Sequence, residues 1–224
     1  MQSLNPAQII LALDLDTFKE AKDFVDKLYP KIKIFKVGSR LFTAYGPKII
    51  ELLHKKGAEV FLDLKYFDIP NTVAGAVEAA VRLKVKMLTL HISGGQEMLE
   101  AAVFAASRQA KALKIARPLL IGVTVLTSQR AKAGEVLALA KQGLASGLDG
   151  VVCSAQEALV LRSKIKKNFV IITPGIRPDN SGKDDQKRIA TVSQAIKARS
   201  DFLVIGRPIL KAADPLAATE KLLE

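Results

Sequence analysis

The sequence FLDLKYFDIPNT, residues 61–72, runs from an apolar stretch into three charged side chains with the spacing Asp-x-Lys-x-x-Asp. Residues two apart in a strand point to the same face, so we expect Asp63 and Lys65 to lie together. Asp68 follows the expected strand end and precedes Pro70, which suits the first turn of a helix. Charges at a strand end are costly unless they are paired or used, so this group is either a structural ion pair or a catalytic acid–base group.

The rest of the chain alternates short apolar runs with longer amphipathic ones. The strand-like runs are residues 9–14, 32–37, 59–64, 86–91, 119–125, 150–154, 169–173 and 202–206. The helical patterns are residues 17–28, 41–56, 71–83, 96–113, 134–146, 156–166, 185–198 and 215–223. Eight such units with nearly continuous apolar strands predict an α/β protein, a (β/α)8 TIM barrel.

A doubly wound sheet is the alternative fold class. The even number of units and the lack of an early glycine-rich loop both favour the barrel. The chain shows no linker, low-complexity stretch or domain boundary. We therefore expect one barrel domain over residues 1–224.

The composition predicts a cytoplasmic protein. Hydrophobic residues make up 49% of the 224 residues, which is enough for a large core. No apolar run reaches membrane-spanning length, and the first residues lack the basic start and apolar stretch of a signal peptide. A single cysteine, Cys153, gives no internal disulfide framework and no cysteine-based metal site.

The formal charge is +12, from 34 Lys and Arg against 22 Asp and Glu. Such a charge is compatible with nucleic acid, a membrane surface or an anionic small substrate. The basic residues are scattered over the helical patterns, are not interleaved with aromatic residues, and occur in a chain without Trp. We interpret most of them as solvated helix faces and keep nucleic-acid binding as the lesser alternative.

In a barrel of this class the active site forms at the C-terminal ends of the strands. Polar and charged residues gather at these ends, whereas the opposite ends carry mostly ordinary loop residues. This asymmetry favours an enzyme over a structural module. The residues at the strand ends are Asp14, Lys36, Asp63 with Lys65, His91, Thr124 to Ser128, Ser154, Thr173 to Arg177, and Gly206 with Arg207.

Lys36 follows the apolar run IKIF, residues 32–35, and so lies at a strand end beside the strand that carries Asp63. Lys36, Asp63, Lys65 and Asp68 can therefore form an alternating array of charges. Flanking carboxylates favour protonated lysines, and flanking ammonium groups favour ionised aspartates. Such an array places negative charge against a substrate carboxylate and an ammonium beside the carbanion that forms. A decarboxylase that works without a metal ion needs both features.

The segments TPGIR, residues 173–177, and IGRP, residues 205–208, follow the last two strand-like runs, where barrels of this class often bind phosphate. Gly206 allows a close backbone approach, and Arg207 can clamp phosphate oxygens. Two ordinary turns are the alternative, but their position favours a phosphate site. Gln186, within residues 178–187, can close over that phosphate.

These residues resemble the orotidine 5′-phosphate decarboxylase family. The resemblance rests on FLDLKYFDIPNT, ALD at 12–14, KVG at 36–38, TVLTS at 124–128, TPGIRP at 173–178 and VIGRPI at 204–209. It extends in order from about Ile9 to Pro215. The resemblance implies a dimeric barrel that converts orotidine 5′-monophosphate to UMP and CO2 in pyrimidine synthesis, with no cofactor and no metal.

The resemblance also implies a role for each site residue. Lys65 is the proton donor to C6, Asp63 lies against the departing carboxylate, Lys36 holds the array and the ribose, and Asp14 binds a ribose hydroxyl. The nucleotide pocket includes Thr127, with Ser128 and Pro174 near the base. Arg177, Gln186, Gly206 and Arg207 hold the phosphate, and Asp68, Ile69 and Thr72 reach into the partner subunit's site.

Two other functions stay open. A related sugar-phosphate decarboxylase, acting for example on 3-keto-gulonate 6-phosphate, shares Asp-x-Lys-x-x-Asp but uses Mg²⁺ and has an acidic residue where this chain has Lys36. A lysine there repels a divalent cation, which favours the nucleotide enzyme. A basic nucleic-acid-binding module is suggested only by the +12 charge and leaves the charges at the strand ends without a role.

Overall fold

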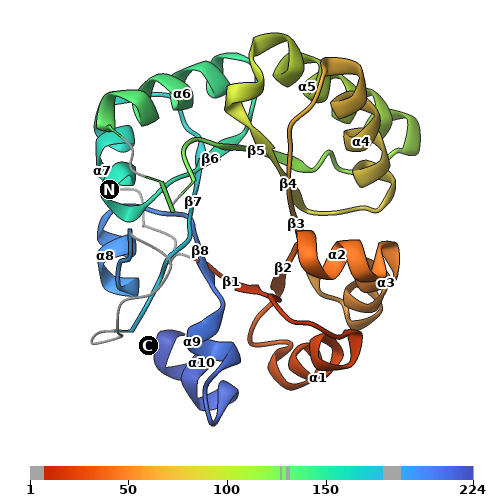
Figure 1. The fold of residues 1–224 in the computed structure, drawn as a ribbon, viewed down its shortest axis with the longest axis vertical. Helices are drawn as coiled ribbons and strands as arrows, with labels where there is room; N and C mark the ends of the chain where they lie inside the picture. The colour runs from red at the N-terminus through yellow and green to blue at the C-terminus, as the bar shows by residue number, and fades with distance from the viewer. Residues whose placement is uncertain (1–7, 127, 130–131, 179–187, 224) are drawn as a thin grey trace.

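A computed structural model describes residues 8–126, 128–129, 132–178 and 188–223 of the chain. Eight parallel strands, in the order in which they occur in the sequence, close into a barrel, and helices surround it (Figure 1). The predicted (β/α)8 class is confirmed. The strands are β1 (Gln8–Ala12), β2 (Ile34–Gly38), β3 (Glu59–Tyr66), β4 (Met87–His91), β5 (Leu119–Val123), β6 (Gly150–Val152), β7 (Val170–Thr173) and β8 (Phe202–Ile205).

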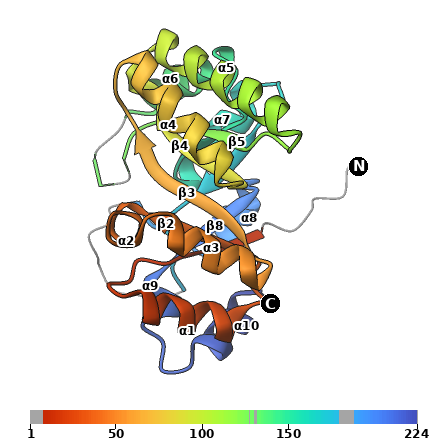
Figure 2. The same ribbon diagram turned by 90° about the vertical axis from the view of Figure 1, so that its right-hand side faces the viewer.

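The helices follow the amphipathic runs of the sequence. Figure 2, turned by 90°, shows β3 as a long inclined strand with α2 and α3 on one side and α4 and α5 on the other. The helical elements are α1 (Phe18–Leu28), α2 (Ser39–Tyr45), α3 (Pro47–Lys56), α4 (Pro70–Arg82), the 3-10 turn η1 (Ile92–Gly94), α5 (Gln96–Leu113), α6 (Ala133–Ala145), α7 (Ala155–Lys164), α8 (Val192–Lys197), α9 (Arg207–Leu210) and α10 (Pro215–Leu223).

Two of the predicted helices differ from the structure. The predicted helix 41–56 is two helices, α2 and α3, because Gly46 adopts a φ of 54° between them and Pro47 starts the second. The predicted helix 185–198 begins at Val192 within the described residues, where the Thr191 side chain caps the first turn. Residues 185–187 of that prediction lie outside the described part of the chain.

The strands are apolar on both faces because each face is covered. Most outward-facing side chains join a large cluster between the strands and the helices. The inward-facing side chains form a smaller cluster inside the barrel, which includes Ile10, Ile34 and Phe61. Two residues further along β2 and β3 are Lys36 and Asp63, so the inner face of these strands changes from apolar to charged toward the C-terminal ends.

No helix among the described residues is both long enough and apolar enough to cross a membrane.

Candidate active site

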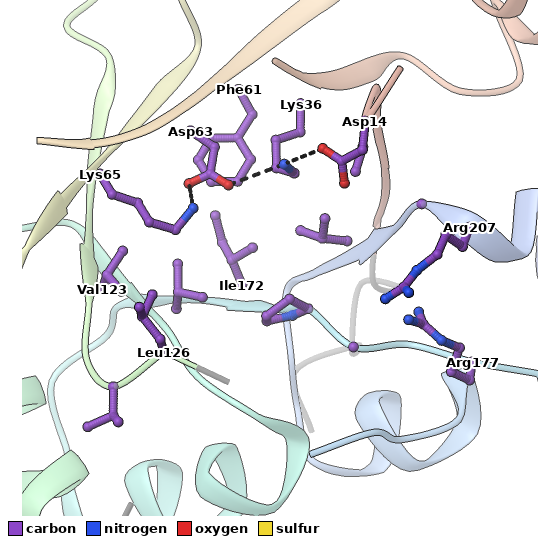
Figure 3. Close-up of a pocket in the computed structure, with 17 residues that line it drawn as sticks. Asp14, Lys36, Phe61, Asp63, Lys65, Val123, Leu126, Ile172, Arg177 and Arg207 are labelled. Carbon is purple, nitrogen blue, oxygen red and sulfur yellow. Dashed lines mark hydrogen bonds and ion pairs between the residues drawn. The ribbon is translucent and has the colours of Figure 1, made fainter. Parts of the chain in front are cut away.

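A cavity of about 220 Å³ opens at the C-terminal ends of the strands. Its lining combines charged groups with an apolar wall that includes Val123, Leu126 and Ile172 (Figure 3). The charged side chains that line it are Asp14, Lys36, Asp63, Lys65, Arg177 and Arg207. They come from both ends of the sequence because closure of the barrel places β1 beside β8.

Four of these charges form a continuous chain along one wall of the cavity (Figure 3). The Lys36 Nζ lies 3.3 Å from Asp14 Oδ1 and 3.3 Å from Asp63 Oδ2. The other oxygen of Asp63, Oδ1, lies 2.8 Å from the Lys65 Nζ. The order is therefore Asp14, Lys36, Asp63, Lys65, with Lys65 at the end that faces the apolar wall.

The two central members of this chain are buried, with 11% of each side chain exposed. Burial by itself would lower the pKa of Lys36, but the Asp63 and Asp14 carboxylates outweigh it and raise that pKa. Burial would likewise raise the pKa of Asp63, but Lys36, Lys65 and two hydrogen bonds outweigh it and lower that pKa. Both groups therefore keep their charges at neutral pH.

The end of β3 is irregular where it carries Asp63 and Lys65. The pairing of β3 with β4 shifts register between Leu62 and Tyr66. Lys65 has a φ of 52°, and its backbone N–H donates to the side-chain Oγ1 of Thr89 in β4 over 2.9 Å. The Thr89 hydroxyl in turn donates to Asp63 Oδ1 over 3.0 Å.

Two arginines face the cavity from the side of β7 and β8 (Figure 3). Arg177 is buried, and its Nη1 donates to the Ile176 carbonyl over 2.9 Å. Arg207 is the first residue of α9, directly after Gly206. Gly206 also lines the cavity, and a Cβ built on it would lie 3.7 Å from Asp14 Oδ2, so this backbone stands close to Asp14. One wall of the cavity thus carries the row of acidic and basic side chains, and the neighbouring wall carries the two arginines.

Comparison with known proteins agrees with this geometry. The sequence matches the model of the "Orotidine 5'-phosphate decarboxylase / HUMPS family" over residues 7–222. The chain belongs to this family. It is 51% identical to the orotidine 5′-phosphate decarboxylase of Laribacter hongkongensis, over 93% of this chain and 88% of that protein. It is 47% identical to that of Saccharophagus degradans, over 96% of this chain and 93% of that protein.

The crystal structure of orotidine 5′-phosphate decarboxylase from Lactobacillus acidophilus has a similar fold. The two structures superpose with a TM-score of 0.84 at 36% sequence identity, and the match covers 97% of each chain. The family that the sequence motifs predicted is therefore confirmed.

The structure brings most of the residues predicted from the decarboxylase family together at the cavity. Asp14, Lys36, Asp63, Lys65, Pro174, Arg177, Gly206 and Arg207 all line it. Thr127 and Gln186 lie outside the described residues. Ser128 is described and exposed, and it is not among the residues that line the cavity.

Asp68, Ile69 and Thr72 lie apart from the cavity within this chain. Asp68 is exposed, and its Oδ1 accepts a hydrogen bond of 2.7 Å from the Ile69 N–H. The predicted array of Lys36, Asp63, Lys65 and Asp68 therefore differs from the chain of charges found within one subunit. Asp14 completes that chain at its opposite end, because the barrel places β1 beside β2.

Other polar residues at the strand ends have structural contacts. Thr124 donates to the Val152 carbonyl over 2.9 Å, and Ser154 caps the first turn of α7. Thr173 and Ser200 share a buried hydrogen bond of 2.7 Å. The His91 ring packs edge-on against Phe67. Thr124, Ser154, Thr173 and His91 were all candidates because they lie at strand ends. That position alone did not distinguish a structural role from a catalytic one.

Sequence reasoning missed Thr89 and Arg188. Arg188 donates from Nη2 to the carbonyls of Val125 (3.1 Å) and Leu126 (2.8 Å), two residues that line the cavity. Its Nη1 pairs with Glu157 at the start of α7. No local pattern reveals these contacts, because their partners lie 24 to 63 residues away in the sequence.

Proposed function

We propose that this chain converts orotidine 5′-monophosphate to UMP and CO2 without a metal ion, as a step of pyrimidine synthesis. The observation that carries the proposal is the chain of four charges, in which the buried Asp63 carboxylate stands 2.8 Å from the Lys65 ammonium beside an open cavity. The two curated relatives described above, both named orotidine 5′-phosphate decarboxylase, support the same substrate.

In this proposal the substrate carboxylate lies against Asp63. The pKa of Asp63 is lowered, so two negative charges face each other, and the Asp63 side chain is largely buried. The bond between C6 and the carboxyl carbon breaks, CO2 leaves, and the electron pair remains on C6. A proton moves from the Lys65 Nζ to C6, and the ammonium stabilises the developing carbanion before that transfer.

Lys36 and Asp14 keep this pair in place. Lys36 lies between two carboxylates at 3.3 Å from each, and it neutralises part of their charge. Asp14 is the most exposed of the four charges and lies next to Gly206, which suits a contact with a ribose hydroxyl. In this proposal Arg177 and Arg207, which both line the cavity, bind the phosphate, and that binding energy organises the reacting groups.

The direct test is the decrease in ultraviolet absorbance when the purified protein meets orotidine 5′-monophosphate. The main alternative is the Mg²⁺-dependent decarboxylation of a sugar phosphate such as 3-keto-gulonate 6-phosphate. The proposal fails if the protein leaves the nucleotide unchanged and decarboxylates the sugar phosphate.

We expect treatment with EDTA followed by gel filtration to leave turnover of orotidine 5′-monophosphate unchanged. The reason is that the Lys36 ammonium lies 3.3 Å from both Asp14 and Asp63, and its positive charge would repel a divalent cation from these carboxylates. Initial rates before and after treatment, with and without added Mg²⁺, measure this. Loss of activity on chelation with recovery on adding Mg²⁺ would contradict the metal-free mechanism.

Replacing Arg207 by alanine is expected to cost on the order of 2–5 kcal/mol of transition-state stabilisation, as for charged contacts that become enclosed when a ligand binds. The loss should appear in kcat/KM for orotidine 5′-monophosphate and be nearly absent for orotidine, which lacks the phosphate. Arg82→Ala is the matched control, because Arg82 is exposed at the far end of α4. Equal losses for both substrates would place Arg207 outside the phosphate site.

We further propose that two copies form a homodimer with shared sites, in which Asp68, Ile69 and Thr72 reach the neighbouring cavity. The segment before α4 exposes two large apolar side chains, with 61% of Phe67 and 67% of Ile69 accessible. Exposed apolar residues at such density are typical of an interface rather than of a free surface. A two-fold contact would cover both copies of this segment at once.

A further inference from the structure

Thr89 stands opposite the irregular part of β3. The pairing of β3 with β4 joins Leu62 to Leu88 and next joins Tyr66 to Leu90. Asp63, Leu64 and Lys65 therefore face a single residue of β4, which is Thr89. Such bulges occur next to active sites, where they change the direction of a side chain. Here the bulge contains both members of the reactive ion pair.

The Thr89 hydroxyl replaces the hydrogen bonds that the strands lose at this bulge. It accepts the backbone N–H of Lys65 over 2.9 Å and donates to Asp63 Oδ1 over 3.0 Å. The same Oδ1 lies 2.8 Å from the Lys65 Nζ. Thr89 is fully buried, so water does not compete for its hydroxyl. One hydroxyl thus fixes the carboxylate and the backbone of the lysine that pairs with it.

Lys65 needs such a restraint. Its φ of 52° lies in the left-handed region, which is unfavourable for residues other than glycine. A backbone of this kind persists only when the surrounding contacts hold it. The bond from the Lys65 N–H to Thr89 acts on the backbone of the strained residue itself.

We propose that Thr89 is a positioning residue that holds Asp63 and Lys65 in their reactive arrangement. The proposal rests on the proposed function, in which these two groups carry the chemistry. Without the hydroxyl, Asp63 Oδ1 loses a donor and the Lys65 N–H loses its acceptor. Lys65 can then relax toward an extended backbone, which moves its Nζ away from the substrate carbon that it protonates.

The test uses Thr89→Val, which keeps the shape of the side chain and removes the hydroxyl. We expect kcat for orotidine 5′-monophosphate to fall about 100-fold, the size of effect that a displacement near 1 Å has on a reacting group. KM should change by less than about threefold, because the binding groups are untouched. Thr89→Ser restores the hydroxyl and should recover most of kcat.

Thr219→Val is the matched control. Thr219 is also fully buried, and its hydroxyl donates to the Pro215 carbonyl over 2.8 Å in α10, away from the cavity. We expect this variant to lose thermal stability without losing kcat. Thr89→Ala is a second hydroxyl-free variant without added bulk, and it should reproduce the loss in kcat. A normal kcat in either hydroxyl-free variant at position 89, or an equal loss in Thr219→Val, would overturn the proposal.

A second measurement does not depend on the substrate. Amide hydrogen exchange at Lys65, followed by NMR, should be faster in Thr89→Val than in the unaltered protein and unchanged in Thr219→Val. If the Lys65 amide exchanges at the same rate in Thr89→Val as in the unaltered protein, that result alone would overturn the proposed restraint. If the unaltered protein leaves orotidine 5′-monophosphate intact, the proposed function fails, and the exchange result still decides whether Thr89 holds Lys65.

Discussion

Lys65→Ala should lower kcat for orotidine 5′-monophosphate by about 10⁴-fold, the upper end of what a positioned proton donor contributes. The variant lacks both the proton for C6 and the ammonium that stabilises the carbanion. Lys36 cannot replace it, because the Lys36 ammonium is held between Asp14 and Asp63. Initial rates from absorbance measurements at saturating substrate would give kcat, and circular dichroism would show that the fold persists.

The matched control for this variant is Lys86→Ala. Lys86 pairs with Glu59 over 2.6 Å, and its side chain is 32% exposed against 36% for Lys65. Both pairs involve β3, but Glu59 lies at the other end of the strand from the cavity. We expect Lys86→Ala to keep its activity. Near-normal turnover by Lys65→Ala would show that another group supplies the proton.

Mixing two inactive variants should restore activity if the active site is shared between subunits. Lys65→Ala and Asp68→Ala homodimers are each expected to be severely impaired. In a heterodimer one site carries both lesions, and the other combines an intact Lys65 with the partner subunit's Asp68. Activity should therefore rise in proportion to the heterodimer formed, to no more than half of the unaltered activity per dimer.

A second mixture serves as the control. Asp63 and Lys65 of one chain form an ion pair of 2.8 Å, so they belong to the same site. Every site in a heterodimer of Lys65→Ala and Asp63→Asn then retains one lesion, and mixing should restore nothing. If subunit exchange is verified and the Lys65 and Asp68 variants also recover nothing, those two residues serve one subunit's site and the shared-site proposal is wrong.

The barrel was predictable because its signals are local. Eight apolar runs alternate with eight amphipathic ones, and a parallel barrel requires that pattern. The proximity of Asp63 and Lys65 was also predicted, from the two-residue period of a strand. The structure confirms the contact but gives it a different basis, since Lys65 leaves the regular strand geometry with a φ of 52°.

The missed features depend on contacts between distant segments. Asp14 joins Lys36 because β1 pairs with β2 in a register that no single strand reveals. Thr89 looked like an ordinary residue of a buried strand, and its role follows only from the bulge on the neighbouring strand. Arg188 falls inside a run that resembled a helix, although its side chain reaches Val125 and Leu126.

The pairing of β1 with β8 has a consequence for synthesis of the protein. During synthesis β1 to β3 emerge early from the ribosome, and this part of the chain contains Asp14, Lys36, Asp63 and Lys65. Arg207 emerges only after β8, the last strand. Until then the edge of β1 has no β8 to pair with and is open to other chains. On the proposed assignment, a prematurely terminated chain has the groups for proton transfer but an incomplete phosphate site. Such a fragment would compete poorly with the finished enzyme for the nucleotide.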